Sequence, residues 1–222
     1  MMANDRTFRA IAVDEPLYFL VEAEQNMAMP AIAKRWRLEE VRALIEASPL
    51  YTPRYELIDG ELLVTSAPNL DHQAAAKELV LILIRYLDAE PIGEVFFSPF
   101  DIELEKESLV QPDVFVIPPL PVPRARKIRQ LETLLLAIEV ISPSSARGDR
   151  VKKRPYYARN DVPEYWVVDP DARVFERSTP NEPRPEVLTD SISWHPLGAV
   201  RPLTIDLPKF FRDVLGEAVP AE

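Results

Sequence analysis

The sequence predicts an α/β domain in which helices flank a central β-sheet. Short apolar runs rich in β-branched and aromatic residues, at 114–117 and 134–138, are typical of buried strands. Two longer segments, 37–47 and about 69–88, carry apolar residues at helical spacing and predict amphipathic helices. Strands and helices that alternate in this way favour a layered α/β architecture.

The length of the chain suits one domain with an extension, since 222 residues can bury a sizeable core. The sequence shows no internal repeats and no sign of a second domain. We expect the following division: an N-terminal extension of unassigned role over 1–35, the domain over 36–216 and a C-terminal tail over 217–222.

The helix predicted for 37–47 ends before Pro49 and leads into a hairpin. Two apolar runs, 55–58 and 62–65, flank Asp59-Gly60, a dipeptide that favours a two-residue hairpin turn. If side chains alternate along the first strand, Glu56 lies on the face opposite Leu57. An ion pair across the strands with a nearby arginine is one interpretation of Glu56.

The second helix begins at Asn69 or Asp71, either of which can cap it, and runs to about residue 88. His72 lies in its first turn and is either a surface residue or a ligand. Consecutive strands are then expected at 93–98 and 100–104, divided by Pro99.

Two carboxylates occur at the ends of apolar strands. Asp113 precedes the run 114–117, and Glu139 follows the run 134–138. A carboxylate at the end of a buried strand is costly unless it is paired or holds a cation. Neighbouring strands that present two such oxygens predict a site for one divalent metal, and magnesium suits one or two carboxylates with water and phosphate. The alternative is that each acid is a surface residue at a strand end.

A helix is expected over 144–160, and it carries Lys153. Pro155 interrupts the pattern, so either the helix kinks there or Pro155 lies in the first turn and Lys153 on a preceding loop. Asp149 and Lys153 are four residues apart, so an exposed salt bridge is the competing interpretation of both. On that basis Lys153→Met is expected to leave folding nearly unchanged.

The rest of the chain predicts further strands and a last helix. Strands are expected at 164–168 and 173–177 and near Val187 and Ile192, and a helix at 207–215. A basic stretch at 124–129 either guides a nucleic-acid backbone or is a solubilising loop.

The order of these motifs resembles the Uma family of restriction endonucleases, which was long catalogued as a domain of unknown function and belongs to the PD-(D/E)xK nuclease superfamily. The resemblance spans about residues 36–215 of the chain. The motifs that carry it are Tyr55 to Leu62, His72, Gln111-Pro112-Asp113, Glu139 to Ser144, Asp149 with Lys153 and Tyr157, and Val162 to Trp166.

The resemblance implies a restriction-endonuclease-like fold with a mixed central sheet and a Mg²⁺- or Mn²⁺-dependent nuclease. It assigns Asp113 and Glu139 to the metal, Lys153 to charge stabilisation and Glu56 to an auxiliary role. The superfamily pattern places its lysine two residues after the acid, where this chain has Ile141, so the lysine has moved to the helix. A catalytically silent module that binds a partner protein is the rival interpretation.

Charge and composition limit which binding partners and which cellular compartment are expected. The formal net charge of −10 opposes non-specific coating of nucleic acid, although a local nuclease site on DNA remains the expected interaction. The absence of cysteine fits a reducing cytoplasm. Apolar runs are too short to span a membrane, and charged residues interrupt any signal-peptide core. The oligomeric state is left open, with a homodimer as one option.

Overall fold

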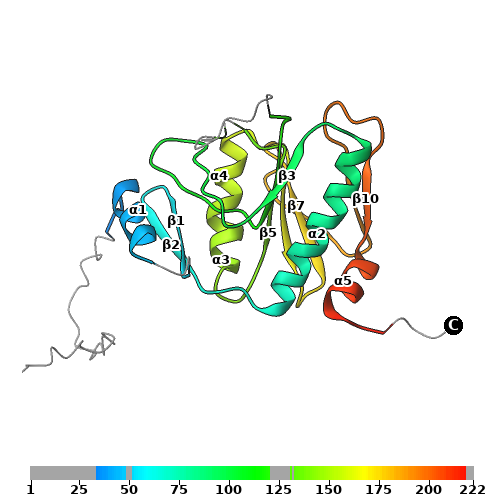
Figure 1. Cartoon of the computed structure of the whole chain (residues 1–222), viewed down its shortest axis with the longest axis horizontal. Coiled ribbons are helices and arrows are strands. Elements are labelled where there is room, and N and C mark those ends of the chain that lie inside the picture. Colours follow the sequence, from blue (N-terminus) through cyan, green and yellow to red (C-terminus); the bar gives the residue numbers. More distant parts are fainter. Residues whose placement is uncertain (1–33, 49–51, 121–130, 132, 219–222) are drawn as a thin grey trace, which may run out of the picture. The chain divides into compact units, whose positions relative to one another are not determined.

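The computed structural model describes residues 34–48, 52–120, 131 and 133–218 (Figure 1). The extension predicted for 1–35 lies outside the described residues apart from Lys34 and Arg35. The basic stretch at 124–129 and the last four residues of the predicted tail also lie outside them.

The described chain contains ten strands, five α-helices and one π-helical turn. The elements up to the middle of the sheet are α1 (Leu38–Ala47), β1 (Arg54–Ile58), β2 (Glu61–Thr65), α2 (Leu70–Ala89), β3 (Glu94–Phe97), β4 (Val114–Ile117) and β5 (Leu136–Val140). The remaining elements are α3 (Ala146–Gly148), η1 (Asp149–Lys153), α4 (Arg154–Arg159), β6 (Tyr165–Asp169), β7 (Val174–Ser178), β8 (Glu186–Leu188), β9 (Ser191–Trp194), β10 (Leu203–Asp206) and α5 (Leu207–Leu215).

Six strands form the central sheet in the order β3-β4-β5-β6-β7-β8. The β5–β6 pair is parallel and the other four pairs are antiparallel, so the sheet is mixed. The crossover between β5 and β6 contains α3, η1 and α4, as a parallel connection requires. The predicted α/β fold with a mixed central sheet is confirmed.

Apolar side chains pack on both faces of this sheet. On one face Leu136 and Ile138 of β5 lie in a core with α2, α5 and the β9–β10 hairpin. On the other face Ala137 of β5 lies in a second core with Tyr156 and Tyr157 of α4. Because side chains alternate along a strand, Glu139 points to this second face together with Ala137. The strand pattern therefore sets the face on which the site forms.

Helix α2 begins at the cap that the sequence indicates. The Asn69 side chain accepts a hydrogen bond of 2.8 Å from the backbone N–H of His72. This bond satisfies one of the free N–H groups of the first helical turn and fixes where the turn starts. This first helical turn also positions the side chain of His72, which is 9% exposed.

We expect Asn69→Ala to lower the free energy of unfolding by about 1 kcal/mol, because the capping hydrogen bond is lost. For a domain of this size the melting temperature should fall by roughly 2–4 °C. Asn69→Asp supplies another capping oxygen and is the matched control. Thermal unfolding followed by circular dichroism measures both, and an alanine variant as stable as the aspartate variant would contradict the assignment.

The crossover helix is continuous but contains one widened turn. Residues of η1 have π-helical geometry, and Pro155 lies in the first turn of α4 that follows. Since proline has no N–H to complete the α-helical bond to the carbonyl of Val151, a wider turn at this point costs little. Lys153 therefore lies on the helix, and the alternative that placed it on a preceding loop is wrong.

The strand predicted at 100–104 is also wrong. After β3 only Ile102 pairs, in an isolated bridge with Val110. The Ser98 hydroxyl donates to the carbonyl oxygens of Gln111 and Pro112, at 3.3 Å and 2.9 Å, and the chain leaves the sheet at this point. An alternating pattern alone does not reveal such a departure.

Candidate active site

Two acids face each other on adjacent strands of the sheet. Asp113 immediately precedes β4, and Val114 pairs with Ile138 of the antiparallel strand β5, which places Asp113 opposite Glu139. Both side chains are buried, with 5% and 0% exposure. The backbone N–H of Val140 donates to Oδ2 of Asp113 at 2.8 Å and fixes that carboxylate against β5.

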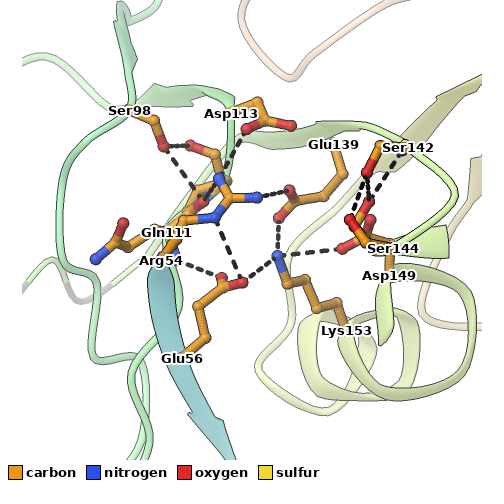
Figure 2. A network of polar contacts seen from close by, with 12 residues as sticks. Arg54, Glu56, Ser98, Gln111, Asp113, Glu139, Ser142, Ser144, Asp149 and Lys153 are labelled. Atoms are coloured by element: carbon orange, nitrogen blue, oxygen red, sulfur yellow. Dashed lines mark hydrogen bonds and ion pairs between the residues drawn. The ribbon is translucent and has the colours of Figure 1, made fainter. Parts of the chain in front are cut away.

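Lys153 reaches this pair from η1. Its Nζ lies 2.9 Å from Glu139 Oε1, 2.8 Å from Glu56 Oε2 and 3.2 Å from Asp149 Oδ1 (Figure 2). The side chain is 1% exposed. The salt bridge with Asp149 that was the competing interpretation does form, but it is buried instead of exposed, and Lys153 contacts two further carboxylates. Lys153 is the last residue of the π-helical turn η1, and π turns of this kind are frequent at functional sites.

Glu56 lies beside the two acids, as expected for an auxiliary acid. The residue opposite it across the β1–β2 hairpin is Leu63, so a cross-strand ion pair does not explain it. Instead Glu56 Oε1 accepts from the backbone N–H of Gln111 at 2.7 Å, while Oε2 faces Lys153. The hairpin thus contributes a carboxylate that connects the lysine to the chain just before Asp113.

Arg54 is part of the cluster and was missed by the sequence analysis. Its guanidinium lies between three carboxylates in Figure 2: Nη1 is 2.8 Å from Asp113 Oδ1, Nη2 is 3.9 Å from Glu139 Oε2 and Nε is 3.7 Å from Glu56 Oε2. Nη1 also donates to the carbonyl of Gln111 at 2.9 Å. The available signal was the strand alternation, which places residues 54 and 56 on one face of β1.

His72 also contacts the site and is buried beside Asp113. Its Nε2 lies 3.0 Å from Asp113 Oδ2, and its Nδ1 is buried without a hydrogen-bond partner among the described residues. Asn69 positions it from the cap of α2. The surface interpretation of His72 is therefore wrong.

The cluster holds more buried negative charge than positive charge. Four buried carboxylates, Glu56, Asp113, Glu139 and Asp149, face the two cations Arg54 and Lys153. Burial is the main reason that the pKa of Glu139 is well above its usual range, even though Lys153 opposes the shift. Burial also raises the pKa of Asp149. With all four acids ionised, the negative charges exceed the two cations by two, and pKa shifts of this kind are frequent at functional sites.

The pKa of Asp113 is shifted in the opposite direction. Burial acts to raise its pKa, but the hydrogen bond with His72 and the charge of Arg54 outweigh burial and hold the pKa below its usual range. For Lys153, burial acts to lower the pKa, yet the neighbouring carboxylates keep it raised. The surroundings therefore favour the ionised form of Asp113 and the protonated form of Lys153, whereas burial disfavours ionisation of Glu139.

Two adjoining pockets open beside Asp113, which lines both. One has a volume of about 200 Å³ and is walled by Arg54, His72 and several hydroxyl side chains. The other, of about 240 Å³, runs along α2 past the exposed ring of Phe97 and shares His72 with the first. Glu139 lines neither pocket and is 0% exposed. Of the two acids, Asp113 is therefore the one that a ligand in these pockets reaches.

The donor set fits a divalent cation of the magnesium type. Such ions take one or two protein carboxylates and keep other positions for water and phosphate oxygens. Asp113 and Glu139 supply two carboxylates on adjacent strands, and Glu139 Oε2 is a buried oxygen without a hydrogen-bond partner in the described chain. No preformed group of three or more metal-ligating side chains occurs among the described residues. The structure thus offers a two-carboxylate site and no closed metal cage.

The fold and this acid and lysine cluster define a protein of the restriction-endonuclease-like class. The chain belongs to the Uma2 family, described as "Putative restriction endonuclease", whose model matches residues 39–207. This confirms the resemblance drawn from the sequence. No curated protein matches the chain significantly.

A solved structure shares the fold. It is the crystal structure of a "putative nuclease belonging to DUF820" from Anabaena variabilis, with a TM-score of 0.64 and 19% sequence identity. The similarity covers 77% of this chain and 96% of that chain.

In the part of the chain that the structure describes, no helix is both long and apolar enough to cross a bilayer.

Proposed function

We propose that this protein is a Mg²⁺- or Mn²⁺-dependent nuclease that hydrolyses phosphodiester bonds. The observation that carries the proposal is the position of Lys153, whose buried ammonium group joins Glu139 and Glu56 beside Asp113. Three separate elements, β1, β5 and η1, converge on this contact. A salt bridge that only stabilises the fold needs one carboxylate. A site that stabilises the negative charge of a transition state needs a cation held in a fixed position near the metal.

Asp113 and Glu139 would hold the divalent cation. A bound ion of this kind lowers the pKa of a water molecule and neutralises charge on the phosphoryl group. Lys153 would stabilise the charge that develops in the transition state, or position the attacking water, from a site closed to bulk solvent. Glu56 fixes the lysine and thereby the direction of its ammonium group.

The substrate is proposed to be nucleic acid, with DNA as the first candidate. The family supports a nuclease-like role, and phosphate oxygens are the natural further ligands of a two-carboxylate magnesium site. The chain's net charge of −10 disfavours a broad electrostatic footprint, so contact should be local to the pockets beside Asp113. We propose a cytoplasmic location on the grounds of composition alone.

The test is a cleavage assay with purified protein on plasmid DNA, single-stranded DNA and RNA. We expect cleavage with Mg²⁺ or Mn²⁺, none with excess chelator and none for Asp113→Asn. Titration calorimetry with Mn²⁺ should show one site that Asp113→Asn removes. A wild-type protein that neither cleaves any of the three substrates nor binds the ion would overturn the proposal.

One observation favours a second candidate, a catalytically silent module that binds a partner protein. Arg54 already provides a cation between Asp113, Glu139 and Glu56, so the fold has an internal partner for its acids. In that case the wild-type protein would show no metal-dependent cleavage, and Asp113→Asn would change stability alone.

A further inference from the structure

The oxygens of the acid pair differ in what they already contact. Asp113 Oδ2 accepts from the Val140 N–H and contacts His72, and Glu139 Oε1 accepts from Lys153. The two remaining oxygens are Asp113 Oδ1 and Glu139 Oε2. Asp113 Oδ1 accepts a hydrogen bond from Arg54 at 2.8 Å, and Glu139 Oε2 has no hydrogen-bond partner among the described residues, so both oxygens become open to a cation once the guanidinium moves.

Both remaining oxygens face the same guanidinium. Nη1 of Arg54 lies 2.8 Å from Asp113 Oδ1, and Nη2 lies 3.9 Å from Glu139 Oε2. The Arg54 side chain is 13% exposed and lines the pocket of about 200 Å³ beside Asp113, whereas Glu139 is buried and lines neither of the two pockets. A cation that bridges the two acids would have to take the place of this group.

We propose that Arg54 competes with the divalent cation, holding the acid pair together when no metal is bound and leaving it when metal binds. The inference rests on the proposed metal-dependent function. Two positive groups cannot share the same pair of oxygens without strong repulsion, so loading requires the guanidinium to move. Arg54 is thus a built-in competitor that weakens metal binding and keeps the metal-free protein folded.

The surroundings of Arg54 allow this exchange without freeing the side chain completely. The carbonyl of Gln111 accepts from Nη1, and Glu56 lies near Nε, so two anchors outside the metal pair remain. Held by these anchors, the guanidinium would stay at the wall of the pocket that a substrate phosphate enters. Arginine suits that position because its planar fork binds phosphate oxygens.

The experiment compares Mn²⁺ affinity, measured by calorimetry and by electron paramagnetic resonance, in wild type and in Arg54→Met. We expect the variant to bind Mn²⁺ at least about tenfold more tightly, because the competing charge is gone. It should also show a lower melting temperature in chelator and a larger rise with Mn²⁺ than wild type. Arg54→Lys, which keeps the charge, should retain weak binding.

The matched control is Arg159→Met. Arg159 pairs with Glu105 and Asp59 on the surface, so its loss removes the same charge at a place away from the acid pair. Its Mn²⁺ affinity should equal that of wild type. Asp113→Asn should abolish binding in both the wild-type and the Arg54→Met backgrounds, which shows that the measured site is the acid pair.

The outcomes separate this inference from the function on which it rests. If wild type and Arg54→Met bind Mn²⁺ equally at the Asp113 site, the competition is refuted and the nuclease proposal stands. If neither binds, the metal-dependent function itself fails. Should Arg54→Met not fold, a crystal structure of wild type with Mn²⁺ decides the question, since a guanidinium still paired with both acids overturns the inference.

Discussion

Lys153→Met is expected to lower metal-dependent cleavage by on the order of 100-fold or more, because the variant lacks a fixed cation in a site closed to water. It should also lower the free energy of unfolding without metal by about 3–5 kcal/mol, since three buried carboxylates lose their partner. The sequence-based expectation of nearly unchanged folding assumed an exposed helix, whereas Lys153 is 1% exposed, so we now expect a loss of stability. Cleavage assays and chemical denaturation in chelator measure the two effects.

Lys152→Met is the matched control for this variant. Lys152 is adjacent, about one third exposed, and pairs with Glu61 on the surface. We expect its removal to change stability by less than about 0.5 kcal/mol and to leave cleavage unchanged. Activity must be compared at a temperature where Lys153→Met is folded by circular dichroism. A folded Lys153→Met that cleaves as fast as wild type would refute the catalytic role.

The elements of the fold could be predicted from local patterns. Alternation and apolar periodicity set the strands and helices, and the segments predicted for 164–168 and 207–215 agree with β6 and α5 to within one residue. The pattern fails at 100–104, where only Ile102 pairs, in an isolated bridge, and the chain leaves the sheet after Ser98, whose hydroxyl bonds to the carbonyls of Gln111 and Pro112. Local sequence does not contain that information.

Part of the candidate site was within reach of the sequence. Asp113 and Glu139 could be singled out because an acid at the end of a buried apolar strand is costly unless it is paired or binds a cation. The family resemblance added Glu56 and Lys153. The structure brings these four side chains together, but their proposed roles stay predictions. The burial of Lys153 was out of reach because it is buried against Glu56 of β1 and Glu139 of β5, which are brought to it only by the tertiary fold.

Arg54 shows a different limit. Strand alternation places Arg54 on the same face of β1 as Glu56, but the local sequence does not show that it has three carboxylate partners. Two of these partners, Asp113 and Glu139, come from the central sheet. The position of the Arg54 charge depends on tertiary contacts, so it can be recognised only in the folded structure, where the hairpin packs against the sheet.

Glu139→Gln should abolish metal-dependent cleavage while leaving the metal-free protein at least as stable as wild type. The loss of one of two proposed metal ligands removes the charge that holds the cation, so cleavage should fall by on the order of 100-fold or more. Stability should rise by about 1 kcal/mol at neutral pH, as often happens when a strained functional group is neutralised. Cleavage assays and denaturation in chelator test both parts.

The gain in stability should depend on pH in a definite direction. Because burial raises the pKa of Glu139 in the folded protein above its unfolded value, the folded state holds the proton more tightly. Wild type therefore loses stability as the pH rises above the unfolded pKa of this acid, whereas glutamine stays neutral and its amide oxygen can still accept from Lys153. The stability advantage of Glu139→Gln should grow from acidic to neutral pH. A variant that is less stable than wild type at every pH would mean that the carboxylate is a structural partner of Lys153, and the metal site would have to be sought elsewhere.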